Sequence, residues 1–473
     1  MELFITDRRL LDGFQMPGLD AVEPRVVLDR AAVAQGMPFI LDADGAYDVR
    51  LNAWLAELPA NDSTSRHTWT AYARDLLIWV RWLFEARDGK TVWDAGGEDF
   101  RAFYFARCRS ENPAERVGPA TWARQRSTMT AFYEYAVGCG YVSRNPCRTR
   151  GLQRQRGRGH RQGLASSSSS PPAKHLSIPA FLLLREIGMR GRPAPDSQFR
   201  ICRRNASRNA AAANLVVSTG LRLEEFSLLL LPQIPVGLLE PGDKLVKLKV
   251  DRLTAKGNRE RFVFVPIRYL RDIWDYVQIE RSVAVSRAQQ SGRYEKIDWR
   301  RTRVDGDRAI ESGRSYPVER LAHDERMRLF VDTDAGGEPA ALWLNEDGLP
   351  MGYEAWKSTM RSAAKACGHA GHPLHATWHT LRHTFAVHTL ACLMELVFGD
   401  RAREFDPTKE KDRALMLDPI RELQLFLGHA DFRTTWNWYL ANAEPARRLL
   451  GRAVETFVDE IVTSELPQRV LER

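Results

Sequence analysis

Residues 375–390, HATWHTLRHTFAVHTL, and residues 423–440, LQLFLGHADFRTTWNWYL, hold the groups around which the rest of the chain is organised. His379 and Arg382 are three residues apart, so on a helix their side chains reach the same side. A guanidinium gives a phosphate two parallel charge-assisted hydrogen bonds and stays protonated. Tyr439 supplies a hydroxyl that can act as a nucleophile. Together the two stretches predict a site that acts on a phosphate.

Each part of these stretches has a simpler interpretation when it is taken alone. A His followed three residues later by an Arg is most often a solvated helix face. Tyr439, beside Trp436 and Trp438, is typical of core packing, and Gly428 after an apolar run is the usual helix stop. The ordered combination, which includes His429 directly after Leu-Gly, therefore carries the prediction.

This combination resembles the tyrosine recombinase (phage integrase) family, over roughly residues 50–455. The family's order is an Arg in a short helix, a Lys in a β-hairpin, His-x-x-Arg, a second His after Leu-Gly, and a nucleophilic Tyr. STGLRLEEFSLL at 218–229 supplies the first Arg, and TAKGNRERFVFVP at 254–266 supplies the Lys. The six matched positions are Arg222, Lys256, His379, Arg382, His429 and Tyr439.

The resemblance implies a role for each matched residue. Tyr439 attacks the phosphorus, and Lys256 protonates the leaving 5′-oxygen. The two arginines and His379 donate to the equatorial oxygens of the pentacoordinate transition state, while His429 positions the phosphate. Neither a metal nor another cofactor is expected, because the sequence has no phosphate-binding loop of the G-x-x-x-x-G-K-[ST] type and no acidic cluster for two metal ions.

Two further residues are expected to support this site. Glu225, three residues after Arg222, can hold its guanidinium, and His383 is expected to pack beside the site. A zinc site at His379, His383 and His388 is the competing interpretation. The first two are four residues apart, as zinc ligands on a helix are, but no Glu follows His379 and no third ligand is obvious.

Length and charge favour two or three domains and a polyanionic partner. The 473 residues carry a formal net charge of +9, with a pI near 9.3. The six cysteines include no C-x-x-C pair, so they indicate neither a zinc knuckle nor a disulfide framework. The sequence shows no signal peptide and no apolar run of about 18 residues, so a cytoplasmic, nucleoid-associated protein without a membrane contact is expected.

The first helical region predicts a small DNA-binding domain. Trp69, Tyr72, Leu76, Trp79 and Leu83 form one apolar stripe at helical spacing. Further helices are expected over 99–108 and 121–137, and the phrase FYEYAVGCGYVSRNP is similar to the end of the family's SAM-like core-binding domain. Four arginines are expected to face outward toward DNA: Arg66, Arg74, Arg124 and Arg126.

A basic segment then marks the clearest boundary in the chain. Seven arginines between residues 144 and 161, without an acidic residue, precede five serines and two prolines, a composition that cannot bury a core. Such a basic segment is either a solvated tail or a linker that contacts DNA. In a linker, the candidate DNA contacts are Arg154, Arg156, Arg158 and Arg161. The expected organisation is an N-terminal extension (1–45), a helical core-binding domain (46–147), the linker (148–176), a catalytic domain (177–455) and a C-terminal tail (456–473).

Within the catalytic region the pattern predicts several local elements. An apolar helix is expected over 226–231, and two strands over 243–250 and 261–266 with Lys256 at the turn between them. Residues 283–335 and 397–417 look like insertions relative to compact family members. Thr434 or Thr435 is expected to cap the helix that bears Tyr439, and Pro445 to begin a new amphipathic helix that ends near 462.

The resulting prediction is a mainly α protein with a small β-sheet (α+β), whose two principal domains form a C-shaped clamp on double-stranded DNA. The resemblance implies a site-specific recombinase, here an integrase of a mobile element, that works as a homo-tetramer on two DNA sites through a Holliday junction, with possible helper proteins.

Two alternatives remain open. A type IB topoisomerase uses a similar residue set as a monomer, and a non-catalytic DNA-binding protein would explain the charge but not the six matched residues.

Overall fold

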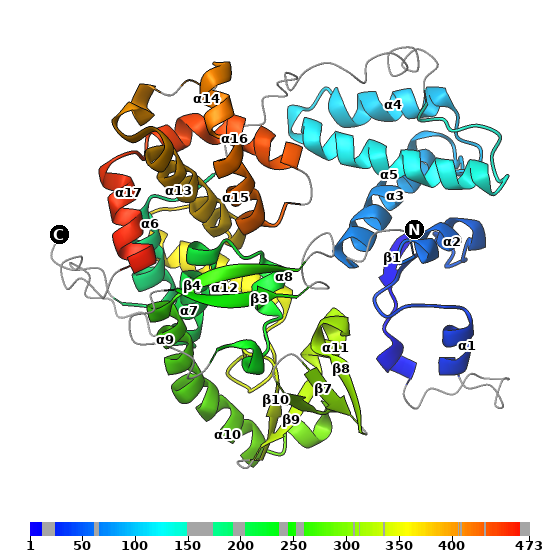
Figure 1. Ribbon diagram of the computed structural model, residues 1–473. Helices are drawn as coiled ribbons and strands as arrows, with labels where there is room; N and C mark the ends of the chain where they lie inside the picture. The colour runs from blue at the N-terminus through cyan, green and yellow to red at the C-terminus, as the bar shows by residue number, and fades with distance from the viewer. Residues whose placement is uncertain are drawn as a thin grey trace. The chain divides into compact units, whose positions relative to one another are not determined.

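The computed structural model describes residues 1–11, 24–60, 66–148, 174–192, 204–235, 245–251, 260–305, 308–311, 313–333, 336–404, 406, 409–429 and 432–463. The chain divides into two compact units, Met1–Ser166 and Ser167–Arg473. Both are mainly helical and carry small sheets, which confirms the expected α+β class (Figure 1). Within the described ranges, no helix combines the length and the apolar character that crossing a membrane requires.

The first unit is a helical bundle with a two-stranded sheet at one end. Its elements are β1 (Glu2–Ile5), α1 (Pro24–Arg30), β2 (Pro38–Leu41), α2 (Val49–Glu57), α3 (Arg66–Ala86), α4 (Gly97–Cys108) and α5 (Pro119–Gly138). The predicted stripe on α3 is confirmed, since Trp69, Leu76, Trp79 and Leu83 are buried and Tyr72 is partly buried against the same core. The antiparallel β1–β2 pair adds Ile40 to the same core, so residues expected to form a separate extension pack into this unit.

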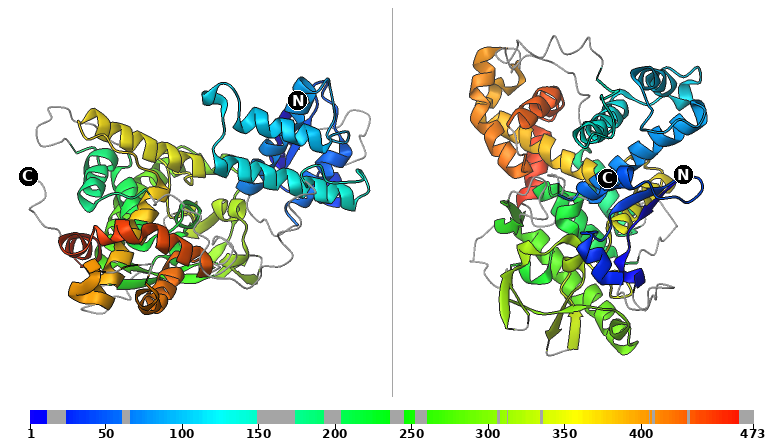
Figure 2. Two further views of the ribbon diagram at one scale, coloured as in Figure 1. Left: turned by 90° about the horizontal axis from the view of Figure 1, so that it is seen from above. Right: turned by 90° about the vertical axis from the view of Figure 1, so that its right-hand side faces the viewer.

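The second unit is built around α7 and α13, two helices that pack against each other (Figures 1 and 2). Alanine and other small apolar residues of α7 are almost fully buried, which lets neighbouring helices approach closely. The helices of this unit are α6 (Ile178–Leu183), α7 (Ala206–Thr219), α8 (Leu223–Ser227), α9 (Ile267–Tyr276), α10 (Ser282–Gln290), α11 (His323–Met327), α12 (Tyr353–His369), α13 (Trp378–Phe398), α14 (Glu410–Leu415), α15 (Leu417–Leu427), α16 (Phe432–Arg447) and α17 (Arg452–Phe457). Short π-helical stretches follow α6, α9 and α17.

Gly220 ends α7 and turns the chain toward Arg222. Its φ of +66° is left-handed, and a Cβ at this position would lie 2.4 Å from the ring of Phe385 on α13. The expected helix over 226–231 is wrong, because α8 ends at Ser227. The residues after α8 pair with residues 340–342 instead. There the Leu229 carbonyl accepts a hydrogen bond from the Leu342 amide (2.9 Å).

The predicted strand pair is present as β3 (Leu245–Val250) and β4 (Arg261–Pro266). The two strands are antiparallel (Figure 1), and Val250 pairs with Arg261 at the end nearest residues 252–259. Lys256 belongs to residues 252–259 and lies outside the described residues.

Part of the charged region 283–335 forms two small three-stranded sheets, while its first residues belong to α10. One is ordered β10-β9-β5, from Gly336–Pro339, Leu329–Thr333 and Arg300–Arg301; the other is ordered β6-β7-β8, from Arg303–Asp305, Arg308–Glu311 and Arg314–Pro317. Residues 300–339 are called the insertion subdomain below. Its apolar core, which includes Val318 and Leu329, packs onto Leu230 just after α8 and onto Ala340.

The C-terminal helices differ from the sequence prediction in two places. α16 begins at Phe432, so Thr434 and Thr435 lie inside its first turns instead of capping it. Pro445 lies within the last turn of α16, where it removes one backbone hydrogen bond, and the next helix begins only after Gly451. Phe457 and Ile461, beyond the expected domain end at 455, are buried in the core of the second unit.

Candidate active site

The first candidate residue, Arg222, lies directly before α8 and is held by Glu225 on that helix. The Arg222 backbone amide and its Nη1 each donate to the Glu225 carboxylate at 2.8 Å. Its Nη2 donates to the Gly428 carbonyl at 3.2 Å, in the turn that follows α15. The predicted contact between Glu225 and the guanidinium is therefore present, and it fixes the direction of the Arg222 fork.

Arg382, on α13, reaches the same turn. Its Nη2 donates to the Leu427 carbonyl at 2.5 Å, and its Nη1 donates to the Gly220 carbonyl. Burial, with the charge of Arg222 beside it, lowers the pKa of Arg382 to about 9, which leaves the group charged at neutral pH. Two guanidinium groups that are 160 residues apart in the chain thus converge on the Leu427–Gly428 turn.

A third arginine, Arg261, completes this cluster and was not predicted. Its Nη1 and Nη2 donate to the two Glu225 oxygens at 2.8 and 2.6 Å, and its side chain is 8% exposed. Period-two alternation on β4 places Arg261 on the same buried face as Val263 and Val265. A charged residue on the inward face of a strand requires a buried counter-ion. The position of Arg261 in the alternation of this strand could therefore have identified it as a site residue from the sequence.

Glu225 is the anionic centre of the cluster. Burial alone would raise the pKa of this fully buried carboxyl, but the hydrogen bonds and charge of Arg261, with Arg222 and Arg382, lower it to about 2. Gly428 allows the approach, because its φ is +60° and a Cβ there would lie 2.9 Å from the Arg261 side chain.

The histidines lie at two neighbouring positions. His379 is exposed on α13, and its ring centroid is 4.1 Å from that of His383. His383 in turn stacks on Trp438 of α16 at 6.5 Å between ring centroids, and burial lowers its pKa to about 4. His429 follows the arginine-binding turn directly, and its Nδ1 lies 2.9 Å from the Thr435 hydroxyl.

Tyr439 lies on α16, fully buried in the core of the second unit. Its ring centroid is 5.5 Å from that of Trp436, the packing arrangement that the sequence offered as an alternative. The structure therefore brings Arg222, Arg382 and Glu225 together beside His429, and joins the helices of His383 and Tyr439 through Trp438. The phenol itself is not exposed at the surface.

The third histidine of the zinc interpretation, His388, faces another part of the unit. Its Nε2 lies 3.3 Å from the Leu176 carbonyl, and its ring stacks on Phe457 at 5.0 Å. Among the residues that the structure describes, no three His, Cys, Asp or Glu side chains gather into a metal-binding group.

His388 is expected to make the second unit sensitive to mild acid. Burial lowers the pKa of His388 from 6.5 to about 4, so below pH 6.5 the unfolded chain takes up a proton that the folded chain does not. The contribution of His388 to stability is therefore fully present above pH 6.5 and falls as the pH falls toward 4, by about 2 kcal/mol at pH 5. Urea unfolding at the two pH values would measure this loss, and a His388→Gln protein with the same loss would contradict the assignment.

The arginines predicted to contact DNA have different surroundings. Arg74 and Arg126 are exposed, whereas Arg66 is half-buried beside Gly36. Arg124 is half-exposed and donates to the buried Asp75 carboxylate of α3 at 2.6 Å, so it also fastens α5 to α3. The linker candidates lie outside the described residues: Arg154, Arg156, Arg158 and Arg161.

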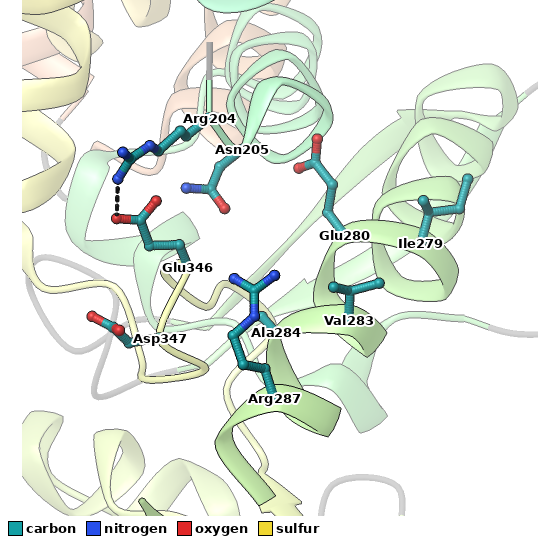
Figure 3. A pocket seen from close by; sticks show the side chains of 9 residues that line it. All are labelled: Arg204, Asn205, Ile279, Glu280, Val283, Ala284, Arg287, Glu346 and Asp347. Atoms are coloured by element: carbon teal, nitrogen blue, oxygen red, sulfur yellow. Dashed lines mark hydrogen bonds and ion pairs between the residues drawn. The ribbon is translucent and has the colours of Figure 1, made fainter. Parts of the chain in front are cut away.

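A pocket of about 650 Å³ lies at the end of α7 away from Gly220 (Figure 3). Arg204 and Glu346 form an ion pair across it at 2.9 Å. The Glu280 carboxylate accepts the backbone amides of Ser207 and Arg208 at 2.9 and 3.1 Å, and so caps the beginning of α7. Of these charged groups, Glu280 holds the beginning of α7.

The chain is similar to known recombinases in sequence. Residues 51–139 match the family described as phage integrase, N-terminal SAM-like domain. The chain is 25% identical to tyrosine recombinase XerD of Ralstonia nicotianae over 376 residues, which span 79% of this chain and 83% of that protein. It is 27% identical to tyrosine recombinase XerD of Caulobacter vibrioides over 212 residues, which span 44% of this chain and 56% of that protein.

Among solved structures, the chain is similar to the XerH site-specific recombinase bound to palindromic difH substrate. The match has a TM-score of 0.46 at 12% identity and covers 86% of this chain and 84% of that chain. The match to the SAM-like domain lies within the first unit and covers its helices α2 to α5. With the Ralstonia match, which extends over most of the sequence, the comparisons support a relationship to the tyrosine recombinases.

Proposed function

We propose that this protein is a site-specific DNA recombinase that cleaves and rejoins DNA strands through a 3′-phosphotyrosyl link at Tyr439. The observation that carries the proposal is the convergence of Arg222 and Arg382 on the Leu427–Gly428 turn, directly before His429. Two guanidinium groups and an imidazole beside one turn offer donors in fixed directions to the oxygens of a phosphodiester.

The proposed cleavage exchanges one phosphoester for another. The Tyr439 oxygen bonds to phosphorus, the bond between phosphorus and the 5′-oxygen breaks, and that oxygen takes a proton from the Lys256 ammonium. The phenolic proton leaves to water, a transfer that His429 can assist. Arg222, Arg382 and His379 stabilise the charge on the equatorial oxygens. The energy of the phosphoester is kept, so neither ATP nor a metal is needed, and a partner strand's 5′-hydroxyl can reverse the step.

Strand exchange between two sites further requires an assembly on DNA. We propose a homo-tetramer on two duplexes, in which each chain closes its two units around DNA and the strands pass through a Holliday junction. The basic segment with Arg154, Arg156, Arg158 and Arg161 would contact phosphates in that clamp. The insertion subdomain and the residues before α3 favour an integrase of a mobile element, with room for helper proteins.

Trapping the covalent intermediate tests the proposal. Purified protein is incubated with nicked suicide duplexes that carry the DNA flanking its own coding sequence, in the presence of a chelator, and run on a denaturing gel. A slowly migrating, protease-sensitive protein–DNA species is expected. Metal-dependent cutting without such a species would refute the phosphotyrosyl mechanism, and relaxation of supercoiled DNA without exchange between two sites would favour the type IB topoisomerase alternative.

A further inference from the structure

The ring of His429 contacts a residue of the helix that carries Tyr439. Its Nδ1 lies 2.9 Å from the hydroxyl oxygen of Thr435. Thr435 is fully buried and precedes Tyr439 by four residues on α16. Residues four apart lie on the same face of a helix, so this contact ties the imidazole to the side of α16 that bears Tyr439.

The backbone of His429 is fixed separately, by Gln424 of α15. The Gln424 side chain donates from Nε2 to the His429 carbonyl at 3.0 Å, and the Gln424 carbonyl accepts from the His429 amide at 3.2 Å. The carbonyls of Leu427 and Gly428, just before it, accept from the two arginines described above. The turn is therefore held by bonds that do not involve Thr435, whose hydroxyl acts on the imidazole ring.

A threonine hydroxyl suits this position because it can either donate or accept a hydrogen bond. A neutral imidazole has one N–H and one bare nitrogen, and the hydrogen bond at one nitrogen decides which of them carries the proton. When the Thr435 hydroxyl donates to Nδ1, the proton of neutral His429 is on Nε2, across the ring, from where it can be donated to a phosphate oxygen. When His429 is protonated, the hydroxyl accepts from Nδ1 instead. The same contact thus serves both charge states.

We infer, on the basis of the function proposed above, that Thr435 is a positioning residue that keeps the proton-bearing Nε2 of His429 directed at the phosphate. A hydrogen bond to the second nitrogen of a functional histidine fixes both its tautomer and the direction of its ring. Without the hydroxyl, this bond holds neither of them, so the phosphate loses part of the contribution of one donor. The arginines keep their own bonds to Glu225 and to the turn.

Thr435→Val tests the inference because it removes the hydroxyl and keeps the branched shape of the side chain. Adduct formation on the suicide duplex should slow about tenfold, the effect of about one lost hydrogen bond. DNA binding should stay within about threefold of wild type, because the lost contribution is made mainly in the transition state. Thr435→Ser keeps the hydroxyl and should form the adduct within about threefold of the wild-type rate.

A double-mutant cycle with His429→Ala separates positioning of the ring from support of the fold. His429→Ala removes the donor itself and should slow adduct formation by about 100-fold to 1,000-fold. Because Thr435 acts through that ring, adding Thr435→Val to His429→Ala should change the rate by less than about twofold. If Thr435 supported only the fold, the tenfold loss seen in the single variant would appear again in the double variant.

Thr384 provides a matched control in the same unit. It is equally buried, and its hydroxyl accepts from the Leu176 amide at 2.9 Å and donates to the Thr380 carbonyl at 2.9 Å. Thr384→Val loses a buried hydroxyl away from His429 and should stay within about twofold of the wild-type rate at a temperature where it is folded. If Thr435→Val folds poorly, Thr435→Ser and Thr435→Ala differ only in the hydroxyl, and the alanine variant should be slower by the same factor of about ten.

Three results would overturn the inference. A wild-type rate of adduct formation in Thr435→Val would mean that the hydroxyl does not position His429. A serine variant as slow as the valine variant would mean that the methyl group matters instead, and effects that multiply in the double variant would mean that Thr435 acts apart from the ring. Failure of the proposed function is distinguishable, since wild type itself would then form no adduct.

Discussion

Tyr439→Phe is expected to abolish the covalent protein–DNA adduct while DNA binding stays within about threefold of wild type. The substitution removes only the hydroxyl that would bond to phosphorus. Phenylalanine fills the same buried volume beside Trp436, so the fold should be retained. Denaturing gels with a suicide duplex measure the adduct, and native gel shifts with the same duplex measure binding.

Tyr276→Phe is the matched control for that substitution. Tyr276 is as deeply buried in the same unit, and its hydroxyl accepts from the Leu344 amide at 2.9 Å and donates to the Leu342 carbonyl at 3.3 Å. Its loss should cost about 1 kcal/mol of stability and leave the adduct yield unchanged. An adduct formed by Tyr439→Phe at the wild-type rate would mean that another residue is the nucleophile.

Glu225→Gln is expected to cost about 3–5 kcal/mol of folding free energy and to remove adduct formation. The uncharged amide leaves Arg222, Arg261 and Arg382 close together without their shared anion, and it cannot accept all of their hydrogen bonds. Urea unfolding measures the loss of stability, and the suicide duplex measures the loss of activity at a temperature where the variant stays folded.

Glu338→Gln separates this effect from the general cost of losing a carboxylate that pairs with arginine. Glu338 accepts from the buried Arg281 at 2.6 Å but is itself 20% exposed and lies outside the arginine cluster. The Glu338 variant should lose less stability and retain the adduct. If Glu225→Gln kept both wild-type stability and wild-type cleavage, the cluster would not be the phosphate site.

The sequence predicted the parts of the fold that follow a regular period. The stripe on α3 and the alternation on β3 and β4 were correct, because burial of one face imposes that period directly. The pairing of Arg222 with Glu225 was also predictable, since three residues separate them at the beginning of a helix.

Other features depend on contacts between distant residues and were missed for that reason. The helix expected over 226–231 ends at Ser227, because the residues after it pair with residues 340–342, more than a hundred residues later. The strands of the insertion subdomain have two to five residues each, too few for a period to be recognised. Arg261 was missed because its counter-ion, Glu225, lies 36 residues earlier in the chain.

The arginine cluster also has a consequence for the charge balance of the reaction. Three guanidinium groups, from Arg222, Arg261 and Arg382, surround the single carboxylate of Glu225, so three positive charges less one negative charge leave two in excess. A phosphodiester in the ground state carries one negative charge, and the pentacoordinate phosphorane carries two. Bound DNA would therefore neutralise this cluster only in part, and the more negative transition state would neutralise it further, which lowers the barrier.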